Sequence, residues 1–203
     1  MPTARDGPAT SQFSPLAFRG TVALSDLAGQ GISDEMSAAV GHAPSGECVA
    51  WGIPFHIGDV VVLQDKVVAV DLDPTTVTWL VLMHTSDRRP FDAEGIISPM
   101  RGQGRLAEHA ADYVLLYEDG MEERASIRRR HQIGDFQRFW GENCFEAVTH
   151  RKPHPMRAAH EQPMAEWGKS QGRATAADSG PWVNWLWACL LYTSPSPRDQ
   201  RPN

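Results

Sequence analysis

The clearest structural signal in this sequence is DYVLLYEDGMEERASIRRR, residues 112–130. Apolar side chains alternate between two faces up to Tyr117, and beyond Gly120 the residues Ala125 and Ile127 alternate with charged ones. A period of two is typical of a β-strand whose faces differ. Between the two runs, residues 118–120 (EDG) predict a tight turn in which glycine adopts a positive φ. We therefore expect a β-hairpin whose charged return strand lies near a sheet edge.

Two apolar segments before the hairpin also favour strands. TVTWLVLMHT, residues 76–85, has the length of a central strand buried on both faces, although its periodicity alone does not exclude a helix. CVAWGIPFHIGDVVVLQDKVVAVDL, residues 48–72, is dense in β-branched residues, which favour strands. Breaks are expected at Pro54 and Gly58, and a turn is expected at residues 64–66.

After the hairpin, GPWVNWLWA, residues 180–188, predicts a last buried strand. Side chains two residues apart share a face of a strand. One face then carries Val183, Trp185 and Trp187, and the other carries Trp182, Asn184 and Leu186. We assign Trp51, Trp79, Trp185 and Trp187 to the core.

The remaining segments give weaker signals. A first strand is expected at residues 21–27, followed by a long surface loop with one helical turn at residues 34–40. Residues 135–140 (DFQRFW) suggest another helical turn, and residues 143–150 (NCFEAVTH) suggest a strand. Residues 1–20 show no periodicity and are interpreted as a loose lead-in to a domain spanning residues 21–188.

Short strands, long loops and little helix predict an all-β fold, since no strand is followed by a long helical pattern. A two-sheet antiparallel β-sandwich is the expected closure, because each sheet must bury one face on another.

The C-terminal segment differs in character from the rest. CLLYTSPSPRD, residues 189–199, resembles one reading frame of a transposase sequencing adapter at all eleven positions. Residues 189–203 are therefore interpreted as a non-native tail, and the native chain is expected to be truncated after Ala188. A short disordered terminus is the alternative interpretation of the same composition. On the first interpretation, deleting residues 189–203 leaves stability unchanged.

Composition narrows the class of protein. The chain has 41% hydrophobic residues and a formal charge of −6, which suits a globular protein and disfavours a nucleic-acid binder. No apolar run reaches the length of a membrane span or a signal peptide, so a cytoplasmic protein is expected if Met1 is the true start. Cys48 and Cys144 make no disulfide framework and are expected to be small buried residues.

Three segments together resemble a known type of domain. They are GECVAWGIPFHIGD (residues 46–59), WLVLMHTSD (residues 79–87) and DYVLLYEDGMEERASIRR (residues 112–129). The pattern resembles bacterial β-sandwich domains of the galactose-binding-like, jelly-roll type, which are similar to carbohydrate-binding modules. The resemblance implies an accessory domain of a larger, often hydrolytic protein. It carries over no site residue, because its landmarks are packing and turn positions.

No catalytic constellation, metal site or cofactor motif is expected from the sequence. The histidines at 150, 154 and 160 lack the HExxH order, and intervening prolines prevent one helical face from collecting them. His84 ends an apolar run and is expected to be held by a backbone hydrogen bond. RGQGR, residues 101–105, is a weak phosphate-loop signal because it follows no strand.

The candidate ligand-binding residues are Trp140, Glu142, Asn143, His150 and His154. Sugar rings stack on exposed aromatic faces, and in WGENC the polar Glu142 and Asn143 next to Trp140 are suited to binding hydroxyl groups. Core packing is the competing interpretation of Trp140. The expected function is a non-catalytic recognition module that binds a carbohydrate or docks on other domains of its own full-length chain. The alternative is the accessory front of a hydrolase, possibly metal-dependent, whose catalytic domain follows residue 188.

Overall fold

The computed structural model describes residues 7–88, 106–138, 143–152 and 180–191. These residues form short β-strands, two 3-10 turns and one short α-helix, so the fold is all-β in class. The elements are β1 (Val22–Ala23), η1 (Leu24–Asp26), α1 (Asp34–Ala39), η2 (Val40–His42), β2 (Gly46–Ala50), β3 (Ile53–Ile57), β4 (Asp59–Val60), β5 (Trp79–His84), β6 (His109–Leu116), β7 (Glu122–Arg128), β8 (Ala147–Thr149) and β9 (Trp185–Leu190).

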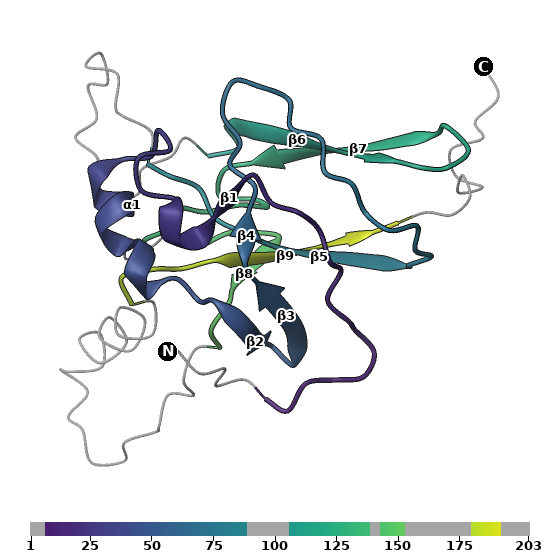
Figure 1. The fold of residues 1–203 in the computed structure, drawn as a ribbon, viewed down its shortest axis with the longest axis horizontal. Coiled ribbons are helices and arrows are strands. Elements are labelled where there is room, and N and C mark those ends of the chain that lie inside the picture. The colour runs from purple at the N-terminus through teal and green to yellow at the C-terminus, as the bar shows by residue number, and fades with distance from the viewer. Residues whose placement is uncertain (1–6, 89–105, 139–142, 153–179, 192–203) are drawn as a thin grey trace.

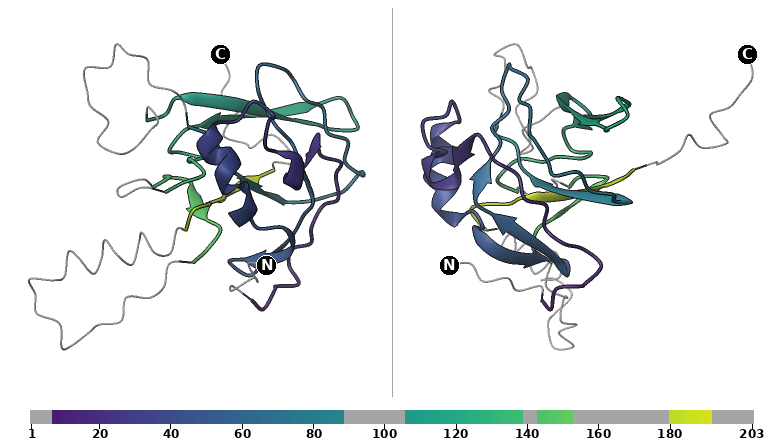
Figure 2. Two further views of the ribbon diagram at one scale, coloured as in Figure 1. Left: turned by 60° about the vertical axis from the view of Figure 1, so that its left-hand side comes forward. Right: turned by 45° about the vertical axis from the view of Figure 1, so that its right-hand side comes forward.

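All pairings between these strands are antiparallel, and the sheets are small and open. Three sheets have two strands each, β1-β4, β2-β3 and β6-β7, and the fourth has the order β5-β9-β8. Figures 1 and 2 show the β6–β7 and β2–β3 hairpins on opposite sides of the β5–β9 pair.

The predicted hairpin at residues 112–130 is confirmed as β6 and β7. Its three-residue loop is closed by hydrogen bonds from the Gly120 amide to the Tyr117 carbonyl (3.0 Å) and from the Tyr117 amide to the Met121 carbonyl (2.9 Å). Gly120 has a φ of +84°, as the turn chemistry predicts. The alternation also holds, because Ile127 is fully buried while Arg128 is exposed.

The last predicted strand is confirmed in part, because β9 begins at Trp185 and not at residue 180, and its place relative to β5 differs from expectation. β9 lies in the middle of its sheet, and β5, predicted to be central, lies at the edge. The expected burial on both faces is not found either, because Trp79 is exposed and the other five residues of β5 are only partly buried. A continuous apolar run does not show how many neighbouring strands there are. The β6–β7 hairpin contacts β5 through a hydrogen bond of 2.8 Å between His84 and Tyr113.

The strand pattern of residues 48–72 is only half realised. Its first half forms β2, β3 and β4, with a two-residue turn at Trp51 and Gly52 that the sequence pattern did not predict. Beyond residue 66 the expected strand is absent, Val67 is 99% exposed, and only an isolated bridge joins Leu72 to Phe18. Strand propensity without a partner strand does not produce a strand.

Other local predictions meet mixed outcomes. The helical turn at residues 34–40 is confirmed as α1, whose N-cap Ser33 accepts a hydrogen bond from the Met36 amide (3.1 Å). The strand suggested within residues 143–150 is confirmed as β8. The first strand is limited to β1, and the described part of residues 135–140 contains no helix.

The core consists of two clusters joined by residues near β9. One contains Phe136 and Trp182 with residues of the α1 region, and the other contains Val183, Trp185 and Trp187. Val183, Trp185 and Trp187 share one cluster, as the prediction of one face requires, but only Trp182 of the other predicted face belongs to the second cluster. Assigning Trp51 and Trp79 to the core was wrong, because they are 39% and 48% exposed. Trp79 is the first residue of β5, and Trp51 lies in the turn between β2 and β3. Cys48 is buried as predicted, whereas Cys144 is only partly buried.

A polar network joins the end of β5 to the segments around β7. The guanidinium Nη1 of Arg129 donates to the Ser86 hydroxyl (3.0 Å), the Asp87 carbonyl (3.0 Å) and the Asp135 carboxylate (3.2 Å). Its Nε lies 3.7 Å from a carboxylate oxygen of Glu108. The side chains of Arg129 and Asp135 are 16% and 6% exposed, so this ion pair lies largely away from water.

The proposed native boundary at Ala188 falls inside β9. Cys189 and Leu190 pair with Leu80 and Trp79, and the Leu191 amide donates to the Thr78 carbonyl (2.9 Å). Residues 192–203 lie outside the described ranges.

Because Leu191 is 8% exposed, we now expect that a chain ending at Ala188 is less stable than one ending at Leu191. The loss is about 2 kcal/mol, from one buried leucine side chain. Urea unfolding of the two truncated chains measures it. Equal unfolding midpoints and slopes would show that residues 189–191 add nothing to the sheet.

Candidate functional site

Of the five predicted ligand-binding residues, the structure describes Asn143 and His150. Trp140, Glu142 and His154 lie outside the described residues, as does the RGQGR segment. Asn143 is exposed, and its side-chain oxygen accepts a hydrogen bond from Arg138.

His150 is buried at the end of β8. Its ring nitrogen Nδ1 accepts a hydrogen bond from the Asn184 amide (3.0 Å), and its own amide donates to the Asn184 carbonyl (2.8 Å). These bonds tie β8 to the segment before β9. Asn143 instead bonds to Arg138, so the described contacts of the two residues do not bring them together.

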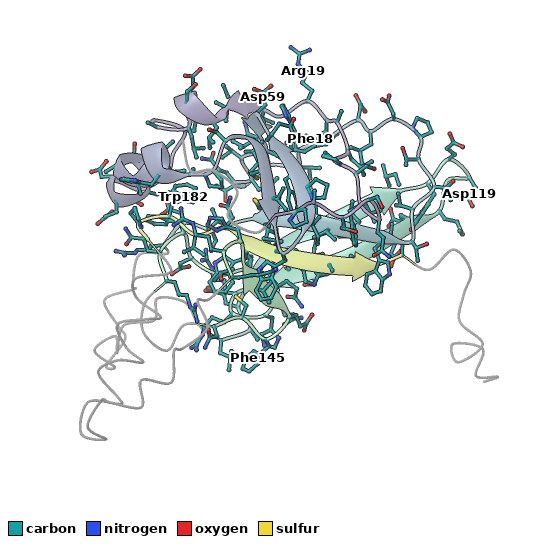
Figure 3. The ribbon with its side chains drawn as sticks, turned by 90° about the horizontal axis from the view of Figure 1, so that it is seen from below. Phe18, Arg19, Asp59, Asp119, Phe145 and Trp182 are labelled. Atoms are coloured by element: carbon teal, nitrogen blue, oxygen red, sulfur yellow. The ribbon has the colours of Figure 1, made fainter. Side chains whose placement is uncertain are left out.

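A surface hollow of about 410 Å³ lies elsewhere, and we name it the Phe18 hollow. It is lined by Ala17, Phe18, Arg19, Asp59, Asp71, Leu72 and Asp73. The hollow is wide open to solvent and is not an enclosed cavity. Figure 3 shows Phe18, Arg19 and Asp59 together on one side of the molecule, with Phe145 on the opposite side.

The hollow forms because residues 18–21 run closely along the chain near β4. A Cβ on Gly20 would lie 2.6 Å from both Asp59 Cβ and the Val60 amide nitrogen, so only glycine permits this approach. The Thr21 amide donates to the Val60 carbonyl (2.8 Å), and the Thr21 hydroxyl accepts from the Val62 amide (3.0 Å). The isolated β-bridge between Phe18 and Leu72 places residues 71–73, the third segment of the hollow, next to Phe18.

The hollow combines an aromatic ring with charged groups. Phe18 is 47% exposed and Leu72 is 44% exposed, so about half of each residue remains accessible. Asp59, Asp71 and Asp73 supply three carboxylates and Arg19 one guanidinium, which gives a formal charge of −2. The carboxylates accept hydrogen bonds, the guanidinium donates them, and the ring offers an apolar face.

A second exposed aromatic side chain stands at the turn between β2 and β3. Trp51 and Gly52 have φ values of +57° and +80°, between the paired residues Ala50 and Ile53. Such turns favour Asn-Gly, because a side chain in the left-handed region costs about 1–2 kcal/mol. The indole Nε1 of Trp51 donates to the Thr149 carbonyl (2.7 Å) and so anchors the turn to β8.

The partly buried pair His84 and Tyr113 is the other chemically notable feature. His84 Nε2 lies 2.8 Å from the Gln132 carbonyl, which can only accept, so the ring proton is on Nε2. Nδ1 then accepts from the Tyr113 hydroxyl (2.8 Å). Burial lowers the pKa of His84 to about 4, against a smaller opposing effect of the Gln132 bond. Burial also raises the pKa of Tyr113 to about 12. Both side chains are neutral at pH 7, and the backbone bond predicted for His84 is confirmed.

The sequence pattern missed both Phe18 and Trp51. Phe18 falls in residues 1–20, which were interpreted as a loose lead-in. The sequence signal that could have identified it is an aromatic residue two positions before Gly20. Trp51 precedes a glycine between two strand-forming runs, which is itself a two-residue hairpin signal.

Within the described residues, no three histidine, cysteine or acidic side chains are grouped so that they could hold a metal ion. In the same residues, no helix has the length and apolar character needed to cross a membrane. Comparison with protein-family models, with curated proteins and with solved structures returns no match to this chain.

Proposed function

We propose that this chain is a recognition module that binds a carbohydrate in the Phe18 hollow. The observation that carries the proposal is a half-exposed aromatic ring set in a hollow with four charged side chains around it. A sugar ring stacks on Phe18 through its C–H groups, while its hydroxyls bond to Asp71, Asp73 and Arg19.

We also propose a more specific fold for the described strands. The small antiparallel sheets are parts of a galactose-binding-like jelly-roll sandwich, a type of domain similar to carbohydrate-binding modules. Two core clusters, one on Trp182 and the other on Val183, support a layered arrangement around the segment that leads into β9.

Replacing Phe18 with alanine is expected to abolish carbohydrate binding while the chain stays folded. Phe18 is 47% exposed, so only about half of the residue is buried, and its bridge to Leu72 is made by backbone atoms; the stability loss is therefore about 1 kcal/mol. Glycan-array binding identifies the ligand, and isothermal titration calorimetry then measures its affinity for each variant.

The matched control is Phe145→Ala, because Phe145 is 71% exposed and lies on the opposite side of the molecule. This variant should bind as the unchanged chain does. An unchanged chain that binds no glycan, or a Phe18→Ala variant that binds as tightly, would overturn the proposal.

Docking on another domain is the second candidate function. It is favoured by the exposed apolar side chains of the segment after β4, which include Leu63, Val67 and Leu72. Clusters of exposed apolar residues mark interaction sites. Carbohydrate binding that depends on Phe18 would favour the first candidate, and a chain that binds no glycan would favour this one.

A further inference from the structure

The turn between β2 and β3 holds Trp51 in a fixed orientation at the protein surface. Its indole N–H is bonded to the Thr149 carbonyl, yet 39% of the residue remains exposed. The polar edge of the ring is therefore satisfied by the chain, and the accessible part of the indole is apolar. A ring that is already fixed loses little conformational entropy when a ligand stacks on it.

The turn chemistry gives a second reason to consider Trp51. Its φ of +57° lies in a region that bulky side chains rarely adopt, and asparagine would suit the position better. Strained residues of this kind gather at ligand-binding positions.

A positive charge accompanies the ring. The ammonium group of Lys152 lies 5.7 Å from the centroid of the Trp51 ring, within the range of a cation–π contact. The Phe18 hollow, in contrast, has an excess of carboxylates. The two aromatic sites therefore favour ligands of different charge.

We propose that Trp51 and Lys152 form a second binding site, which takes an acidic saccharide. One sugar ring stacks on the accessible part of the indole, and its carboxylate forms an ion pair with the Lys152 ammonium. This site shares no residue with the Phe18 hollow, so it stands whether or not the hollow binds a carbohydrate.

The test uses the full chain and an oligogalacturonate as the probe, with a neutral maltooligosaccharide of equal length for comparison. Trp51→Asn removes the ring and suits the left-handed turn, so its melting temperature should stay close to that of the unchanged chain. Lys152→Gln removes the charge at an exposed position. Lys66→Gln is the matched control, since it removes another exposed lysine from a different loop.

Titration calorimetry should show saturable binding of the oligogalacturonate, weakened about tenfold or more by Trp51→Asn and by Lys152→Gln but not by Lys66→Gln. The neutral oligosaccharide should not compete for this site. The absence of saturable binding would overturn the proposal. The proposal would also be overturned if both lysine variants weakened binding equally and Trp51→Asn left it unchanged. Nonspecific attraction to positive charge would then explain the binding. If Trp51→Asn does not fold, the comparison of Lys152→Gln with Lys66→Gln still tests whether Lys152 binds the oligogalacturonate.

Discussion

Replacing Arg129 with methionine is expected to lower the free energy of unfolding by about 3–5 kcal/mol. Methionine keeps the length of the side chain but leaves the Asp135 carboxylate, 6% exposed, without its cation. It also removes the hydrogen bonds that hold the Ser86 hydroxyl and the Asp87 carbonyl. Urea unfolding at neutral pH, followed by tryptophan fluorescence, measures the change.

Two further variants separate the ion pair from general effects of losing an arginine. Arg124→Met removes an exposed arginine whose contact with Asp112 spans 3.4 Å, and it should cost less than about 1 kcal/mol. The double variant Arg129→Met with Asp135→Asn should be more stable than Arg129→Met alone, because a neutral amide then replaces the buried Asp135 carboxylate. Equal losses of unfolding free energy in Arg129→Met and Arg124→Met would show that the buried ion pair contributes no more to stability than the exposed one.

The second large effect is a loss of stability as the pH falls from 6.5 to 4. Burial lowers the pKa of His84 in the folded chain to about 4, whereas an unfolded histidine keeps the ordinary value of 6.5. Within this window the unfolded chain binds the proton and the folded chain does not, so falling pH favours unfolding. The free energy of unfolding should drop by about 3 kcal/mol across the window, since each pKa unit corresponds to about 1.4 kcal/mol.

The comparison that isolates His84 is the variant His84→Gln, which has no titrating group at this position. Its stability should depend less steeply on pH between 6.5 and 4 than that of the unchanged chain. An NMR titration of the imidazole reports the same quantity directly. A His84 ring that titrates near its ordinary pKa, or equal pH slopes in the two proteins, would contradict the structural assignment.

Elements that depend on local sequence were predicted well. The β6–β7 hairpin needs only alternation and the glycine at position 120, and α1 needs only a capping serine before a short run of helix-forming residues. The arrangement of β5 and β9 was not predicted, because which strand lies at the edge depends on contacts between residues about a hundred positions apart. Strand propensity beyond residue 66 was misleading for the same reason, since no partner strand pairs with it among the described residues.

The candidate site was less predictable than the fold. Trp140 was predicted to bind a ligand because polar residues stand next to it in the sequence, but it lies outside the described residues. Phe18 becomes notable only when residues 17–19 meet Asp59 and Leu72 across the chain. Trp51 was assigned to the core because tryptophan is usually buried, and the exposed turn that holds it depends on a left-handed backbone.

The place of β9 between β5 and β8 has a consequence for biosynthesis. Within the described sheet, β5 and β8 pair only with β9, which is translated after both of them. A nascent polypeptide emerging from the ribosome would therefore present β5 without its paired strand until the ribosome has passed the codons of β9. Pairing between strands so far apart in the chain slows folding and leaves a strand edge exposed while it is incomplete.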